Sequence, residues 1–173
     1  MSELSSKAKK GTKQSPSLKA RALRLLSLRE YSRKTLGAKL AESEARWAKL
    51  TETESTPQAS ALSIEAVLDD FEARGWLSDE RFAEALARRL SERYGTRKIQ
   101  EDLQRAGVDA QHSAKLLADL RETEFERAYG LWSKKYGVKA QDQKERARQY
   151  RFLASKGFGL DVVAKIIGGQ IPD

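Results

Sequence analysis

A helix-ending glycine followed at once by a large apolar residue recurs along this chain, and it constrains the fold more than any other feature. The three pairs are Gly75-Trp76, Gly107-Val108 and Gly157-Phe158. Glycine readily takes the left-handed conformation that ends a helix, and an apolar residue just after the end packs back onto that helix. Each pair therefore predicts the end of a short helix and a tight turn into the next one.

Between these glycines the apolar residues follow the helical period of 3.6. Ile64, Val67, Leu68 and Phe71 have the i, i+3, i+4, i+7 spacing of one helix face. The sequence has no stretch of strand-like alternation and no hairpin signal. We therefore predict an all-α protein of about nine short helices.

The stretch after the first of these glycines predicts a hinge between two packed helices. Ser78 is a typical N-cap residue, and the acidic pair that begins at Asp79 suits the positive end of a new helix. Leu77 and Phe82 occupy the two positions of a hydrophobic staple. We expect Trp76 to be buried at this turn.

Apolar positions also repeat in register. At an offset of 63 residues the matches pair Tyr31, Leu36 and Leu40 with Tyr94, Ile99 and Leu103. At an offset of 50 residues they include Leu103, Gly107 and Leu117, which match Leu153, Gly157 and Ile167. Leucine is common enough for some chance matches, but several matches in one register, with a stop glycine among them, favour true repetition.

We interpret the chain as three tandem three-helix repeats, with helix-turn-helix-like units at 17–75, 76–121 and 122–169. Residues 43–60 lose the apolar pattern, which predicts an inserted loop in the first repeat. Residues 1–15 are rich in serine and lysine, which predicts a disordered basic tail. Because units this small bury little surface alone, they must stack on one another, giving an elongated molecule that can curve.

The balance of charge points to an anionic partner. Lysine and arginine number 33 against 25 acidic residues, a formal net charge of +8. Such a surface suits nucleic acid, an acidic protein face or membrane headgroups, although solvated lysines alone would give the same composition. The chain has no cysteine, no secretory signal at its start and no apolar run long enough to span a membrane. We expect a cytoplasmic protein without a membrane partner.

The residues needed for common catalytic or metal chemistry are missing. His112 is the single histidine, and without a second histidine or a cysteine a zinc site is not expected. Neither a phosphate-binding glycine loop nor a nucleophile elbow is present. We therefore predict no catalytic residue, no metal, no cofactor and no enzymatic activity.

Arginine and lysine instead gather on exposed helix faces, where part of them pair with interleaved acids. Collectively they suit binding to an anionic surface. The candidate contact residues are Arg24, Arg33, Arg81, Arg88, Arg97, Lys98, Lys134, Lys135, Arg148 and Arg151. Three-helix units can also resemble DNA-binding modules, so a helical DNA-binding or transcription regulator is an alternative, and a helical-repeat adaptor for another protein is a third.

The segment FEARGWLSDERFAEAL at 71–86 resembles the signature of the RecX family of bacterial recombination regulators. The matching residues are Gly75, Trp76, Leu77, Asp79, Phe82 and Ala83. The segments 23–40, 94–108 and 151–167 resemble, in this order, the family's opening, middle and closing segments. The stretch at 43–60 and the tail at 1–15 depart from the family pattern.

This resemblance implies a non-enzymatic modulator of RecA built from three tandem three-helix repeats. It implies a protein that lies in the groove of the RecA–single-stranded-DNA filament, meeting DNA mainly through the filament. It also implies inhibition of the recombinase, ATPase and SOS coprotease activities. We expect the chain to be a monomer. The signature residues, together with Gly107, Gly157 and Phe158, are expected to have architectural roles.

Overall fold

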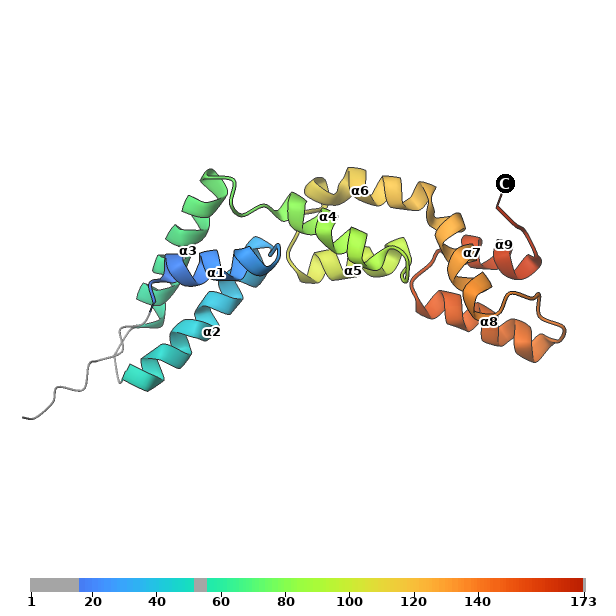
Figure 1. The fold of residues 1–173 in the computed structure, drawn as a ribbon, viewed down its shortest axis with the longest axis horizontal. Helices are drawn as coiled ribbons and strands as arrows, with labels where there is room; N and C mark the ends of the chain where they lie inside the picture. The colour runs from blue at the N-terminus through green and yellow to red at the C-terminus, as the bar shows by residue number, and fades with distance from the viewer. Residues whose placement is uncertain (1–15, 52–55, 173) are drawn as a thin grey trace, which may run out of the picture.

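The computed structural model describes residues 16–51 and 56–172, and its regular structure there is entirely helical. The nine helices are α1 (Leu18–Leu28), α2 (Arg33–Thr51), α3 (Pro57–Ala73), α4 (Asp79–Leu90), α5 (Thr96–Arg105), α6 (Ala110–Glu122), α7 (Glu124–Lys135), α8 (Gln143–Ser155) and α9 (Leu160–Gly168). They lie in three successive groups of three along an elongated arc (Figure 1). The predicted all-α, elongated fold is confirmed.

Each group of three helices has its own hydrophobic core. The first core centres on Leu36, Leu40 and Phe71, the second on Ile99 and Leu103. The third contains Leu153, Phe158 and Val163. Helices pack closely within a group, and between neighbouring groups α6 packs on α7. Apolar burial therefore stabilises each group from within, and the connections between groups depend largely on other contacts.

The loop predicted over 43–60 is wrong. Helix α2 continues to Thr51, and α3 begins at Pro57 behind the N-cap residue Thr56, whose side chain accepts from Ala59 N. The end of α2 is rich in alanine, glutamate, lysine and arginine, which sustain an exposed helix without an apolar stripe. Proline suits the first helical position, because its missing N–H would have no partner there. Residues 52–55 and the predicted tail at 1–15 lie outside the described residues.

The three predicted stop glycines all have left-handed backbone conformations. Their φ angles are +70° at Gly75, +77° at Gly107 and +83° at Gly157. The predicted cap after the first of them is also confirmed, because the Ser78 hydroxyl accepts from Arg81 N at 3.2 Å. Short helices therefore end and restart where the sequence indicates.

The apolar residues at the first of these turns differ from the prediction. Trp76 is 45% exposed and packs edge-on against Phe71, so its expected burial is wrong. Leu77 enters the first core, whereas Phe82 packs against the second. The two side chains thus serve different cores instead of forming one staple, and the turn between them is the connection between two helix groups.

Carboxylates fix the two connections between groups in the same way. Asp79, which opens α4, accepts a hydrogen bond from Arg33 N at 2.7 Å. Glu124, which opens α7, accepts one from Thr96 N at 2.7 Å. Arg33 and Thr96 are each the first residue of their group's second helix, and they are 63 positions apart. At both connections an acid of the following group therefore satisfies a free helix N–H of the preceding group.

A second hydrogen bond also recurs at both connections. The Ser32 hydroxyl donates to the carbonyl of Ala106 at 2.6 Å. The N–H of Gly95 donates to the carbonyl of Lys156 at 3.0 Å. Ser32 and Gly95 are related by the offset of 63, and Ala106 and Lys156 by the offset of 50. The repeat seen in the apolar residues thus extends to the polar contacts that join the groups.

Replacing Gly75 with alanine is expected to lower the free energy of unfolding by about 1 kcal/mol, because only glycine takes this backbone conformation without strain. A methyl group there would meet no atom within 4 Å, so the cost is purely conformational.

Gly130, inside α7, has the same free space, and Gly130→Ala should stabilise the chain by up to about 1 kcal/mol. Urea unfolding measures both changes; equal stability of Gly75→Ala and the wild type would contradict the assignment.

Candidate interface for an anionic partner

The basic side chains divide into a paired set and an unpaired set. Within residues 16–51 and 56–172, every ion pair is formed by residues in the part of the sequence that runs from Lys19 to Asp119. Helices α7 to α9, as described here, contain none, although they carry many lysines and arginines. Apart from Arg127 and Lys139, which donate to backbone carbonyls of the chain, the positive charge of the third group is therefore left available to a partner.

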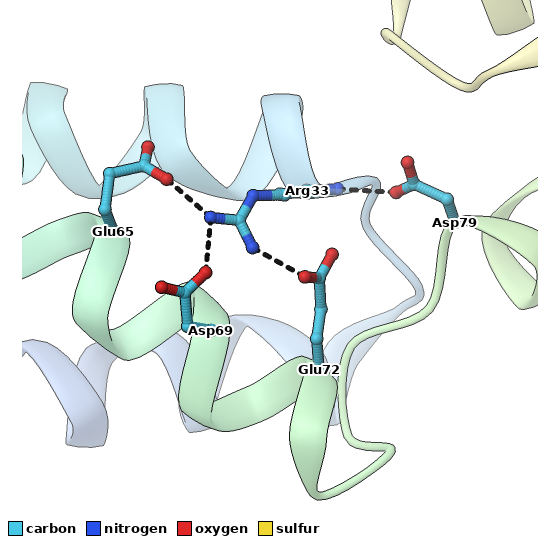
Figure 2. Close-up of polar contacts among 5 residues, drawn as sticks. All are labelled: Arg33, Glu65, Asp69, Glu72 and Asp79. Atoms are coloured by element: carbon cyan, nitrogen blue, oxygen red, sulfur yellow. Dashed lines mark hydrogen bonds and ion pairs between the residues drawn. The ribbon is translucent and has the colours of Figure 1, made fainter.

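Arg33 has the most extensive set of acidic contacts (Figure 2). Its guanidinium lies 2.7 Å from Asp69, 2.5 Å from Glu65 and 2.6 Å from Glu72. These three carboxylates share one face of α3, and chiefly through the Asp69 and Glu65 hydrogen bonds they raise the pKa of Arg33 above its usual value. Its backbone N–H meets Asp79, as described above. The structure thus gives this predicted contact residue a structural role, holding α2 against α3 and α4.

Four other predicted contact residues are also engaged within the chain. Arg81 contacts Glu30 and the Trp76 carbonyl, and Arg88 contacts Glu84. Arg97 contacts Glu101 and the Ala154 carbonyl, and Lys98 contacts Asp102. The Arg88 and Arg97 ion pairs are long, at 4.0 Å, and exposed, so each contributes little. Arg97 and Arg81 also bridge neighbouring groups. These residues therefore help to stabilise the folded chain, and other cations are left unpaired.

Arg24 differs from this paired set. It is exposed on α1, and its guanidinium has no hydrogen-bond or ion-pair partner in the part of the chain that the structure describes. Helix α1 belongs to the group at one end of the arc, whereas α7 and α8 belong to the group at the other end (Figure 1). By itself it does not form a surface.

The remaining predicted residues come together on the third group. Lys134 and Lys135 end α7, and Arg148 and Arg151 lie on α8; all four are exposed. Lys135 Nζ lies 3.9 Å from the centre of the Phe152 ring, which places the end of α7 against α8. This part of the molecule is the best candidate for contact with an anion.

Two further cations belong to the same surface as the predicted contact residues. Lys144, Arg148, Phe152 and Lys156 follow one another at intervals of four residues, so they form one row along α8. Lys144 and Lys156 were not among the predicted contacts, although the spacing alone could have indicated them. The row has an aromatic ring between cations, a pattern found in surfaces that bind single-stranded nucleic acid.

Neither metal nor membrane features emerge from the described residues. Within them no group of three or more histidine, cysteine, aspartate or glutamate side chains is placed to hold a metal ion. His112 is exposed on α6. Among the described helices, none is both long and apolar enough to cross a membrane.

Comparisons with known proteins agree on one family. Residues 78–117 match the model of the RecX second three-helix domain, and residues 122–167 match the model of the RecX third three-helix domain. A regulatory protein RecX of Leptothrix cholodnii is 41% identical over 87% of both chains. One from Ralstonia pickettii is 39% identical over 88% of this chain and 87% of its own. The crystal structure of RecX from Lactobacillus salivarius has a similar fold, with a TM-score of 0.65, 18% identity and coverage of 87% and 92%.

Proposed function

The chain belongs to the RecX family, and from this premise we propose that it regulates the RecA recombinase by binding the RecA–single-stranded-DNA filament. In this proposal it inhibits strand exchange, ATP hydrolysis and the SOS coprotease activity, and so modulates DNA repair. The observation that carries the proposal is the similarity to regulatory RecX proteins over most of the chain.

The architecture suggests how such regulation works. Three helix groups, each with its own core, are joined by repeated hydrogen bonds into one elongated body. A body of this shape can contact successive RecA protomers, compete with other ligands of the filament groove and block growth at a filament end. It needs no catalytic residue, metal or cofactor to do so, and we place it in the cytoplasm as a monomer.

Binding to the filament should weaken steeply as salt rises, because the proposed contacts are ionic and several cations act together. The test is fluorescence anisotropy of the labelled chain, titrated with RecA filaments at a series of salt concentrations. A matched titration with RecA alone, without DNA, shows whether the filament is required. Affinity that does not change with salt would contradict the ionic interface.

A helical DNA-binding module remains the second candidate function, and the basic row on α8 is the observation that favours it. A transcription regulator of this kind would bind duplex DNA with a clear preference for one sequence. Competition by unrelated duplexes separates the two functions. Equal competition by all sequences counts against sequence-specific regulation.

A further inference from the structure

We propose that the third helix group binds the phosphate backbone of single-stranded DNA through one defined surface. This phosphate surface consists of Lys144, Arg148, Phe152 and Lys156 on and at the end of α8, with Lys135 at the end of α7. The proposal rests on the function above only in that the RecA filament would supply the strand. It separates the third group, which meets DNA, from the first two, whose cations are mostly paired within the chain.

The spacing of the row suits the regularly spaced phosphates of a nucleic-acid strand. Four residues of an α-helix rise by about 6 Å, so successive members of the row are about that far apart along α8. Lys144 and Arg148 are exposed, and neither has an ion pair within the described structure. Arg151 lies beside the row and is likewise exposed. An extended strand of phosphates can therefore meet several of these cations in succession.

The Phe152 ring holds two lysines in place without cancelling their charge. Lys135 Nζ lies 3.9 Å from the centre of this ring, and Lys156 Nζ lies 5.8 Å from it. Lys156 Nζ also lies 5.2 Å from the centre of the Tyr94 ring, and the Tyr136 and Phe152 rings pack edge to face. A ring face attracts a cation through its quadrupole, and unlike a carboxylate it leaves the net charge intact. Two ammonium groups at one ring repel each other, and a bound phosphate would relieve that repulsion.

The nearby acids are occupied elsewhere. Asp142 caps the start of α8 by accepting from Glu145 N at 2.7 Å. Glu145 in turn accepts from Gln141 N at 3.3 Å. Both lie at the end of α8 that is farthest from Lys156. In the described structure no lysine or arginine of the row forms an ion pair with them, although Glu145 and Arg148 line one surface pocket.

Single-stranded DNA fits this surface better than an acidic protein face does. Proteins that bind single strands without sequence preference combine a row of cations along the backbone with aromatic side chains. The phosphate surface has that composition, with Phe152 between Arg148 and Lys156. The even spacing of the row also suits the regular phosphates of a strand, which an acidic protein face does not require.

The test uses the full chain and a fluorescein-labelled oligothymidylate, with Kd measured by anisotropy. The double variant Lys144→Gln/Arg148→Gln should weaken binding about tenfold or more. The slope of log Kd against log salt should fall by about 1.4, since each phosphate contact in single strands contributes about 0.7. The matched control is Arg105→Gln/Lys115→Gln, which removes the same charge from exposed, acid-paired positions on α5 and α6. The control should change Kd by less than about twofold.

Three results would overturn the phosphate surface. The two double variants could weaken oligonucleotide binding equally, or Lys144→Gln/Arg148→Gln could bind the oligonucleotide as tightly as the wild type does. Finally, Lys144→Gln/Arg148→Gln could lose binding to the RecA filament while it keeps full binding to the bare oligonucleotide. The last would mean that the surface contacts RecA protein instead. Failure of the proposed function looks different. In that case the wild-type chain would not bind RecA filaments or slow their ATP hydrolysis, while the Lys144→Gln/Arg148→Gln variant still lost oligonucleotide binding.

Discussion

Replacing Gly95 with alanine is expected to lower the free energy of unfolding by about 3 kcal/mol, at the upper end for an overpacked site. A Cβ atom at this position would lie 2.2 Å from the Gly157 carbonyl oxygen and 2.3 Å from Phe158 Cα. Both are backbone atoms, so neither can rotate away as a side-chain end could. The φ angle of Gly95 is −75°, which any residue adopts, so the cost comes from the close approach alone.

The clash would fall at the connection between the second and third helix groups, where Gly95 N also donates to the Lys156 carbonyl. Urea unfolding of the intact chain measures the loss of stability, and Gly130→Ala serves as the control for adding a methyl group where there is room. A Gly95→Ala variant as stable as the wild type would show that the two groups do not approach so closely.

Replacing Arg127 with methionine is expected to cost about 3 kcal/mol as well, because several carbonyls would lose their only charged donor. The Arg127 guanidinium donates to the carbonyls of Ser91 at 2.7 Å, Tyr94 at 2.9 Å and Leu120 at 2.7 Å. It thereby ties α7 to the end of α6 and to the turn between α4 and α5. Burial lowers the pKa of Arg127, partly offset by Glu124, so these hydrogen bonds must compensate for lost hydration.

Thermal and urea unfolding of Arg127→Met measure this effect. Arg127→Lys should recover part of the stability at most, since an ammonium cannot reproduce the fork of a guanidinium. Arg121→Met is the matched control, because Arg121 lies in the last turn of α6, close to the start of α7, and its side chain is exposed. Similar losses for Arg121→Met and Arg127→Met would contradict the role given to Arg127.

The order of helices could be predicted from the sequence because it depends on local signals. Gly75, Gly107 and Gly157 end helices through a backbone conformation that a single residue controls. The offsets of 63 and 50 came from apolar residues, yet they also relate Ser32 to Gly95 and Ala106 to Lys156. Equivalent positions in a repeat occupy equivalent places, so a register found in the cores carries over to the connections.

Other features depend on which surfaces meet in space, and the sequence pattern does not contain that information. The sequence predicts a free cation at Arg33, but the folded chain brings it against three acids of α3. These acids lie more than thirty positions further along the sequence. Trp76 looked like a core residue, but Leu77 fills the core position and leaves the indole exposed. The apolar pattern predicts a loop at the end of α2, because an exposed helix has no apolar stripe.

The phosphate surface falls between these two cases. Its spacing along α8 is visible in the sequence, whereas the absence of acidic partners among the described residues is a property of the folded arrangement. Lys135 and Lys156 reach Phe152 from different parts of the chain, and only the packing of α7 on α8 brings them together. Which of many lysines remain unpaired could therefore not be predicted from composition or periodicity.

The most direct test of the central claim is the filament titration run in parallel with bare single-stranded DNA, at about 0.15 M salt, where surface charges are screened beyond about 8 Å. We predict that the labelled chain binds RecA–single-stranded-DNA filaments much more tightly than the bare strand, because protein contacts add to those of the phosphate surface. Equal or tighter binding to the bare strand would contradict the account, and would make the chain a nucleic-acid-binding protein with the RecX fold.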